Sequence, residues 1–410
     1  MLPLFLLACA GRSDNPEPQV MLAVDPAVIP APMPQVQPEL PVPAHNASSS
    51  VGAASNAFAQ DLYGKLPADG NLIFSPTSIQ TAMAMTMSGA NGGTRSALEK
   101  SLHLNFEDSD QAMGAWLNAL NAPAETHTLR VSNRIWPAKD LGLKSEYLTL
   151  SAELYGVQPE QLNYQEPEAA RTTINTWVSE QTQDRIPELI PAGAITPATR
   201  LVLTNAVYFL ADWERQFNAN DTAERMFHTD ANEGIMVPFM NAQGLQKVGT
   251  IAGAQTLVMP YAGGKQEMVL VLPNADKSIA DFGPATLIEA AASVTSQMTK
   301  LALPKVEMNW NQSLGGPLVA LGMGPAFSDE ADFSKISDED LLISEVVHQA
   351  FLKMDEKGTE AAAATAVMMR ATSMPPPPQV TLTVDRPYLF AIRDIESGAL
   401  LFVGRVEDPR

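Results

Sequence analysis

The residues that could carry chemistry are few and widely spaced. The 410-residue chain has five histidines and one cysteine, Cys9, and no two histidines lie at the spacing of metal ligands. The histidines are His45, His103, His127, His228 and His348. The sequence has no Gly-x-Ser-x-Gly elbow, Ser-x-x-Lys pair, phosphate loop or Gly-x-Gly-x-x-Gly. We expect no metal, no cofactor and no enzyme, although a serine triad assembled from distant residues stays open.

Composition narrows the class of protein further. The chain carries 26 Lys+Arg against 46 Asp+Glu, a formal charge of −20, with 45% hydrophobic and 18% charged residues. That apolar fraction supports a large buried core and is not typical of a disordered acidic tail. The negative charge argues against nucleic acid as a partner. One cysteine makes neither an internal disulfide nor a zinc site, and the length suggests two or three domains.

The single cysteine follows an apolar run at residues 2–8, in the order Leu6-Leu7-Ala8-Cys9. This arrangement resembles the lipobox of a bacterial lipoprotein, in which cleavage before the cysteine frees it to receive a lipid. The run is too short to span a membrane. Residues 1–9 are therefore predicted to be a signal peptide with lipidation at Cys9, and the alternative is an ordinary signal peptide with an incidental cysteine. In both cases we expect export, to the outer membrane as a lipoprotein, to the cell surface or to the extracellular space.

Residues 10–50 are predicted to be a proline-rich linker. Nine prolines lie in residues 11–50, and they are Pro16, Pro18, Pro26, Pro30, Pro32, Pro34, Pro38, Pro41 and Pro43. Such a segment stays extended and spaces a domain away from a membrane, although a leader without a role has the same composition. The remaining residues, 51–410, are predicted to form one body.

A coarse pattern along that body indicates mixed α and β structure. Helical spacing occurs over residues 56–66 and 173–181, and Ser75-Pro76 predicts the start of a helix. Strand-like runs cover residues 129–136, 201–209, 256–259, 268–272, 301–306, 389–392 and 400–403. Gly263-Gly264 predicts a hairpin between two of these runs. Helices cluster early and strands dominate late, which favours an α+β fold over a βαβ alternation.

Residues 356–367 give conflicting signals. Four alanines at residues 361–364 favour a helix. Read as a strand, one face carries only small or β-branched uncharged side chains, while Glu360 lies on the other face. The residues of the uncharged face are Thr359, Ala361, Ala363, Thr365 and Val367. Such a strand could slide between two neighbours without burying a charge, whereas an alanine-rich surface helix is the structural alternative.

The order of several motifs resembles the serpin family over residues 55–410. Asn71, Phe74, Ser75-Pro76, Ser78 and Ile79 resemble the family's Asn-x-x-Phe-Ser-Pro-x-Ser-Ile stretch. Further similar stretches lie at residues 174–178, 185–189, 203–209, 321–334, 356–365, 385–390 and 402–406, and at Trp213, Phe217 and His348. Tyr388 stands where phenylalanine is usual, which is a mild departure.

The resemblance implies one α+β domain of three β-sheets and about nine helices, with an exposed reactive-centre loop over residues 356–378. It also implies a monomer and corrects the length-based expectation of several domains. A protease would cleave the loop, form an acyl-enzyme and be trapped when the loop inserts into the main sheet. The hinge residues would be Glu356, Gly358, Thr359, Glu360, Ala361, Ala362, Ala363, Ala364 and Thr365.

Counting forward from Glu356 by the family's usual hinge length puts the scissile bond near Thr372-Ser373, and counting back from Arg386-Pro387 gives about Ser373-Met374. We choose Thr372-Ser373, which suggests an elastase-like or subtilisin-like serine protease that accepts a small residue. Arg370-Ala371 would suit a trypsin-like protease instead, and Met368 or Met369 a chymotrypsin-like one. The four prolines at residues 375–378 hold the chain beyond the bond extended.

The resemblance also implies control residues beneath and at the end of the main sheet. Ser75, Ser78, Asn205 and His348 would control sheet opening, and Trp213 would mark the point where the strand enters. Read from residue types alone, His348 is a satisfied core histidine and Trp213 an aromatic core residue. Two alternatives to a serine protease inhibitor remain, a non-inhibitory serpin that acts as a binding or scaffold module and a cross-class inhibitor of cysteine proteases.

Overall fold

The computed structural model describes residues 45–229, 234–359 and 377–410. The chain divides into two compact units, residues 1–38 and residues 39–410, and the first lies outside the described residues. No helix among the described residues is long and apolar enough to cross a bilayer. Cys9, residues 10–44 of the predicted linker and residues 360–376 of the predicted loop also lie outside that part of the chain.

Eight α-helices occur among the described residues, and six of them lie before residue 182. They are α1 (His45–Tyr63), α2 (Pro76–Ser88), α3 (Gly92–Ser101), α4 (Ser109–Leu120), α5 (Ser145–Tyr155), α6 (Pro167–Gln181), α7 (Pro284–Ala292) and α8 (Gly315–Leu318). Ser75 caps α2 by accepting a hydrogen bond from the Ser78 N–H, with Pro76 in the first turn, which confirms the predicted helix start.

The ends of α1 differ from the prediction of a helix over residues 56–66. The helix begins at His45, so it includes residues 45–50 of the predicted linker, and it ends at Tyr63. Gly64 and Pro67 follow that end, and both residue types stop helices. Periodicity alone did not detect the first turns because Ser48, Ser49 and Ser50 interrupt the apolar pattern.

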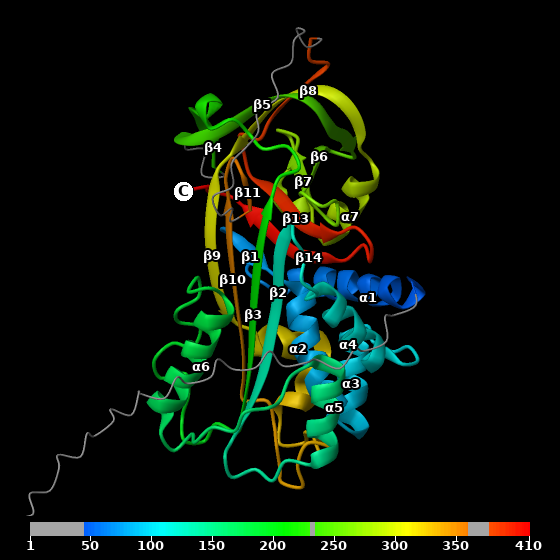
Figure 1. Ribbon diagram of the computed structural model, residues 1–410, viewed down its shortest axis with the longest axis vertical. Coiled ribbons are helices and arrows are strands. Elements are labelled where there is room, and N and C mark those ends of the chain that lie inside the picture. The colour runs from blue at the N-terminus through cyan, green and yellow to red at the C-terminus, as the bar shows by residue number, and fades with distance from the viewer. Residues whose placement is uncertain (1–44, 230–233, 360–376) are drawn as a thin grey trace, which may run out of the picture. The chain divides into compact units, whose positions relative to one another are not determined.

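One sheet of five strands runs in the order β2-β3-β11-β10-β9. Its strands are β2 (His127–Pro137), β3 (Leu201–Asp212), β11 (Gly358–Thr359), β10 (Glu345–Met354) and β9 (Val306–Ser313). In Figure 1, α6 and the group α2–α5 flank this sheet from opposite sides. Trp177 of α6 meets Trp136 of β2 edge to face, with ring centroids 5.6 Å apart, which fixes the helix on the sheet.

The remaining strands form one hydrogen-bonded sheet of nine, in the order β1-β14-β13-β7-β6-β5-β8-β12, with β4 also paired to β5. They are β1 (Leu72–Phe74), β4 (Ala223–His228), β5 (Gly234–Ile251), β6 (Ala254–Pro260), β7 (Gln266–Pro273), β8 (Thr295–Pro304), β12 (Val380–Thr383), β13 (Tyr388–Asp394) and β14 (Leu400–Val406). Gly263 and Gly264 have positive φ at the β6–β7 turn, which confirms the predicted hairpin.

The α+β fold class is confirmed, but the number of sheets differs from the predicted three. Among the described residues there are two hydrogen-bonded sheets rather than three, and eight α-helices. The 18-residue strand β5 pairs with β4 through residues 234–239 and with β6 through residues 247–251. One long strand therefore joins two groups of strands that the three-sheet description keeps apart.

Candidate functional site

The predicted hinge enters the five-stranded sheet. Gly358 pairs with Asp212 and Thr359 with Ala211 of β3, while Thr359 also pairs with Met354 of β10. This two-residue strand, β11, therefore lies between β3 and β10. An ideal Cβ at Gly358 would lie 2.0 Å from the carbonyl oxygen of Ala211, so only glycine fits this close approach.

Below β11 the two neighbouring strands pair directly with each other. Residues 345–350 of β10 form a parallel ladder with residues 202–207 of β3. His348 and Asn205 pair directly with each other in this ladder, so no strand lies between β3 and β10 at that level. At the end of the ladder where β11 lies, β11 separates the two strands. Any further strand inserted between β3 and β10 would have to break this ladder, which we call the seam.

Thr359 is fixed by a buried aromatic pair. Its side chain is fully buried, and its Oγ1 lies 2.6 Å from the hydroxyl of Tyr261. The Tyr261 ring stacks on Trp213, with ring centroids 4.6 Å apart and an interplanar angle of 13°. Burial raises the pKa of Tyr261, so this hydroxyl stays protonated and can share its proton with Thr359. The side chain of Thr359 consequently points to the core side of the sheet.

Backbone hydrogen bonds hold the residues that lead into the hinge. The Trp213 N–H donates to the Lys357 carbonyl at 2.7 Å, and the Trp213 indole Nε1 donates to the Asp355 carbonyl at 2.9 Å. The Phe217 N–H donates to the Glu356 carbonyl at 2.8 Å. The segment of residues 213–217, which connects β3 to the strands above, therefore serves as the outer support of the hinge.

Glu356 anchors the start of the hinge through its side chain. Its carboxylate accepts hydrogen bonds from Lys305 Nζ at 2.9 Å and from Thr222 Oγ1 at 2.7 Å. Burial by itself would raise the pKa of Glu356, but these two donors hold it below its ordinary value. The carboxylate is therefore ionised at neutral pH and forms a partly buried ion pair with Lys305.

Four of the predicted control residues meet in one buried hydrogen-bond network under the seam. The Ser75 N–H donates to His348 Nε2 at 3.1 Å, so Nε2 carries no proton. His348 Nδ1 therefore carries the proton and donates to Asn205 Oδ1 at 2.5 Å. The Asn205 amide donates in turn to Ser78 Oγ and to Asn133 Oδ1. Burial lowers the pKa of His348 to about 3, which matches this neutral tautomer.

The structure thus brings together Ser75, Ser78, Asn205 and His348, and it places Trp213 beside the hinge. The predicted hinge residues divide at Thr359, because residues 360–365 lie outside the described part of the chain. The predicted scissile bond Thr372-Ser373 and its alternatives at Arg370-Ala371 and at Met368 or Met369 lie outside it as well. No group of three or more metal-ligating side chains occurs among the residues that are described.

Sequence reasoning missed four contributors to the site, Asn133, Thr222, Tyr261 and Lys305. Asn133 had a detectable signal, since it shares a strand face with Val131 and Ile135 and is thus a polar residue at a position where the pattern demands an apolar one. The other three had no such signal. Each lies far from the hinge in sequence and reaches it only through the tertiary fold.

Replacing Gly358 by alanine should displace the hinge from the sheet. The new Cβ would meet the Ala211 backbone, and we expect a loss of about 1–3 kcal/mol in the free energy of unfolding, typical of overpacking. Urea denaturation measures the loss, and faster amide exchange at Thr359 would show that β11 has left. Gly93→Ala on α3 is the matched control, because its Cβ meets nothing within 4 Å. Equal stability and equal exchange in both variants would contradict the tight fit.

Comparison with known proteins gives a consistent result. The family model described as "Serpin (serine protease inhibitor)" matches residues 53–409. An uncharacterized serpin-like protein of Thermococcus kodakarensis is 34% identical over 100% of this chain and 97% of its own length. The leukocyte elastase inhibitor of Bos taurus is 33% identical over 88% of this chain and 99% of its own. The crystal structure of a highly specific serpin from the insect Tenebrio molitor matches with a TM-score of 0.77 and 30% identity, covering 89% of this chain and 98% of that one.

Proposed function

The chain belongs to the serpin family, and from that premise we propose that it inhibits serine endopeptidases as a suicide substrate. The protease serine attacks the carbonyl carbon of the scissile bond, an ester forms, and the amine of the following residue leaves. The freed loop then continues β11 down the seam between β3 and β10. The attached protease is carried along and distorted before water can cleave the ester.

The position of β11 is the observation that carries this proposal. Gly358 and Thr359 of the predicted loop are already strand residues between β3 and β10, and residues 360–376 of that loop follow them directly in the sequence. Extension of this strand needs no new entry point. It needs only that the seam between residues 202–207 and 345–350 open, and each ladder hydrogen bond lost there would be replaced by bonds to the inserted strand.

The loop sequence suits that extension. Because the Thr359 side chain faces the core beside Tyr261, Ala361, Ala363 and Thr365 would face the core when inserted, and all three are small and uncharged. Glu360 would face the opposite side of the sheet. Over residues 361–365 the inserting strand therefore places neither a charge nor a bulky group on its core face.

A protease with a preference for small residues is the target we propose. Thr372 precedes the bond at which the family loop length places cleavage. The relative from Bos taurus is named a leukocyte elastase inhibitor, which supports an elastase-like or subtilisin-like partner for this chain. The net charge of −20 would also speed the encounter with a basic protease at low ionic strength.

A panel of serine and cysteine proteases read by denaturing gel tests the proposal. We expect a covalent complex that survives denaturant with at least one serine protease, and mass spectrometry of the released peptide should place the cut at Thr372-Ser373. Complexes with cysteine proteases alone would establish the cross-class alternative. Cleavage without any stable complex across the panel would leave a non-inhibitory serpin, and in that case cleavage should not raise the thermal midpoint.

We also propose that the chain is exported and that Cys9 carries a lipid, with residues 10–44 as the spacer. The support is sequence alone, namely the order Leu6-Leu7-Ala8-Cys9 and the proline content of the spacer. Expression of the full chain in a bacterium with labelled fatty acid should give a labelled, membrane-associated protein. Cys9→Ser should lose the label. Equal labelling of both proteins, or none in the parent, would exclude the anchor.

A further inference from the structure

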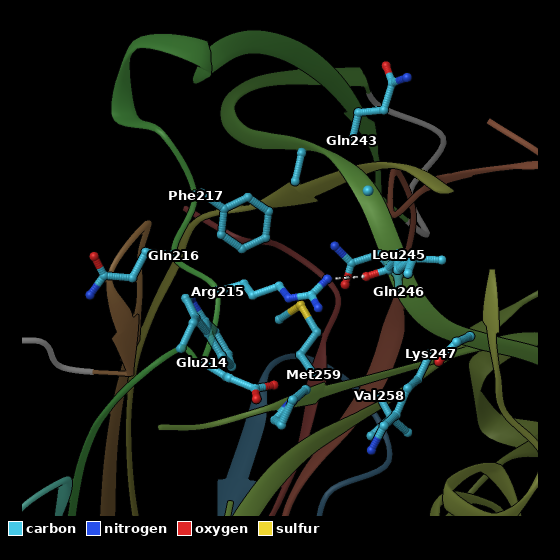
Figure 2. A pocket seen from close by; sticks show the side chains of 15 residues that line it. Glu214, Arg215, Gln216, Phe217, Gln243, Leu245, Gln246, Lys247, Val258 and Met259 are labelled. Carbon is cyan, nitrogen blue, oxygen red and sulfur yellow. Dashed lines mark hydrogen bonds between the residues drawn. The ribbon is translucent and has the colours of Figure 1, made fainter. Parts of the chain in front are cut away.

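A cavity of about 290 Å³ lies against the segment that supports the hinge. Figure 2 shows the cavity between residues 213–217 on one side and strand β5 on the other, with Met259 of β6 beside the Arg215 side chain. This volume is near the lower end of the range for small-molecule sites, which starts at about 300 Å³. It could therefore hold an aromatic ring or a chain of medium length, and it is too small for a folded partner.

The lining of the cavity combines apolar and cationic groups. Phe217, Val258 and Met259 are buried apolar residues, and they form one part of the wall. Arg215 and Lys247 are exposed, and neither forms an ion pair with a described residue. The Arg215 guanidinium reaches across to β5 and donates through Nη1 to the Leu245 carbonyl at 3.1 Å (Figure 2).

The lining of this cavity has a net positive charge, whereas the chain as a whole has a net negative charge. Arg215 and Lys247 contribute two positive charges and Glu214 one negative charge, a net of +1 in a chain with a net charge of −20. The free N–H groups of an Arg guanidinium suit a carboxylate, which accepts two parallel hydrogen bonds from them. The lining therefore favours an anion with an apolar body.

We propose that this cavity is a binding site for a small amphipathic anion, such as a medium-chain or aromatic carboxylate. The carboxylate would contact Arg215, with Lys247 adding a second positive charge, and the apolar part would cover Phe217 and Met259. Gly244 of β5 provides room for it, because a Cβ added there meets no atom within 4 Å.

Occupation of the cavity would act on the hinge through shared residues. Trp213 and Phe217 line the cavity, and their backbone N–H groups donate to the carbonyls of Lys357 and Glu356. A ligand packed on residues 213–217 restrains that segment and so protects these two hydrogen bonds. Amide exchange at Trp213 and Phe217 should slow when the ligand binds.

Calorimetric titration of the full chain with octanoate tests the site, with octanol as the uncharged probe. We expect saturable binding of one octanoate, weaker binding of octanol, and slower amide exchange at residues 213 and 217. Arg215→Ala should weaken octanoate binding roughly tenfold, since a hydrogen bond to a charged group contributes at least that much. Gly244→Leu should abolish binding by filling the cavity. Lys100→Ala on α3 removes an equal charge far from the cavity and should change nothing.

Only variants whose thermal midpoint equals that of the parent are used to compare affinities. If another variant does not fold, Lys247→Ala tests whether a positive charge of the lining contributes to octanoate binding. The proposal is overturned by absence of saturable binding, by octanol binding as tightly as octanoate, or by unchanged affinity in Gly244→Leu. No protease is present in this experiment. Absence of octanoate binding would therefore not contradict the proposed inhibition. Absence of a covalent complex in the protease panel would likewise not contradict the proposed binding site.

Discussion

If the chain inhibits by the proposed loop insertion, arginine in place of Ala363 is expected to make it a substrate that the protease simply cleaves. Residues 359 and 363 lie on the same face of an extended strand, and the Thr359 side chain points to Tyr261 in the core. An arginine inserted at position 363 would therefore be buried without a partner. Burial of an unpaired charge costs several kcal/mol, and each 1.4 kcal/mol in the barrier to insertion slows it tenfold. The protease should then complete hydrolysis before the loop has moved. We expect the yield of covalent complex to fall by about 100-fold or more.

Ala362→Arg is the matched control for this change. It introduces the same charge and volume one residue earlier, on the strand face that Glu360 also occupies and that points away from Tyr261. The stoichiometry of inhibition, measured against the protease found in the panel, should rise far more for Ala363→Arg than for Ala362→Arg. Equal loss in the two variants, or greater loss in Ala362→Arg, would show that the loop does not insert in this register.

The second large effect concerns His348. Replacement by alanine removes the acceptor of the Ser75 N–H and the donor to Asn205 Oδ1, both of which are buried. Each orphaned polar group costs about 1–3 kcal/mol, so the free energy of unfolding should fall by about 3 kcal/mol or more. The loss lies directly under the seam, because His348 and Asn205 are paired residues of β10 and β3. The seam should open more readily as a result.

Native gels after mild heating would detect that opening. His348→Ala should lose monomer to inserted or polymeric forms at temperatures at which the parent stays monomeric. His228→Ala is the control, since His228 is exposed and its backbone N–H, which alanine retains, is the group that donates to the Asp385 carbonyl. Unchanged monomer content in His348→Ala would refute a role for the network in sheet opening.

The same histidine predicts a pH dependence of stability. Its pKa is about 3 in the folded protein against 6.5 as the ordinary value, so only the unfolded chain binds the proton between these limits. Stability from this group is complete above pH 6.5 and falls as the pH drops, by about 1.4 kcal/mol for each pH unit. Protonation would also place an N–H on Nε2 facing the Ser75 N–H donor.

Denaturation at pH 6.5 and 4.5 measures this effect. We expect the free energy of unfolding to fall by about 2–3 kcal/mol more in the parent than in His348→Gln over this interval, because glutamine does not titrate. The contributions of all other titrating groups cancel in this difference. Identical pH dependence in the two proteins would mean that His348 titrates normally in the fold, and it would contradict the lowering of its pKa by burial.

Local patterns predicted the local features of the fold. Ser75-Pro76 marked the start of α2 because a side-chain cap and a fixed proline φ act within a few residues. Gly263-Gly264 marked a hairpin for the same kind of reason. The merging of strand groups through β5 could not be predicted, because strand pairing joins residues far apart in sequence and periodicity reports only which face of a strand is buried.

The site shows the same division. The small, uncharged alternation after Thr359 is written in the sequence, and so is the order of motifs that resembles the family. The sequence does not show whether the hinge has entered the sheet, because Gly358 is held there by the backbone of Ala211 and Thr359 by Tyr261. Nor did any local signal join Glu356 to Lys305, 51 residues away.

By itself, then, the sequence determined the α+β class, the family resemblance and a loop that can be buried without burying charge on one face. Only the tertiary structure decided that Asn133 completes the network of His348 and Asn205, that β11 already wedges the seam, and that a cavity adjoins the hinge support. The physical reason is range. Propensity, capping and alternation act over a few residues, whereas His348 and Asn205 meet across 143 residues through packing of the whole chain.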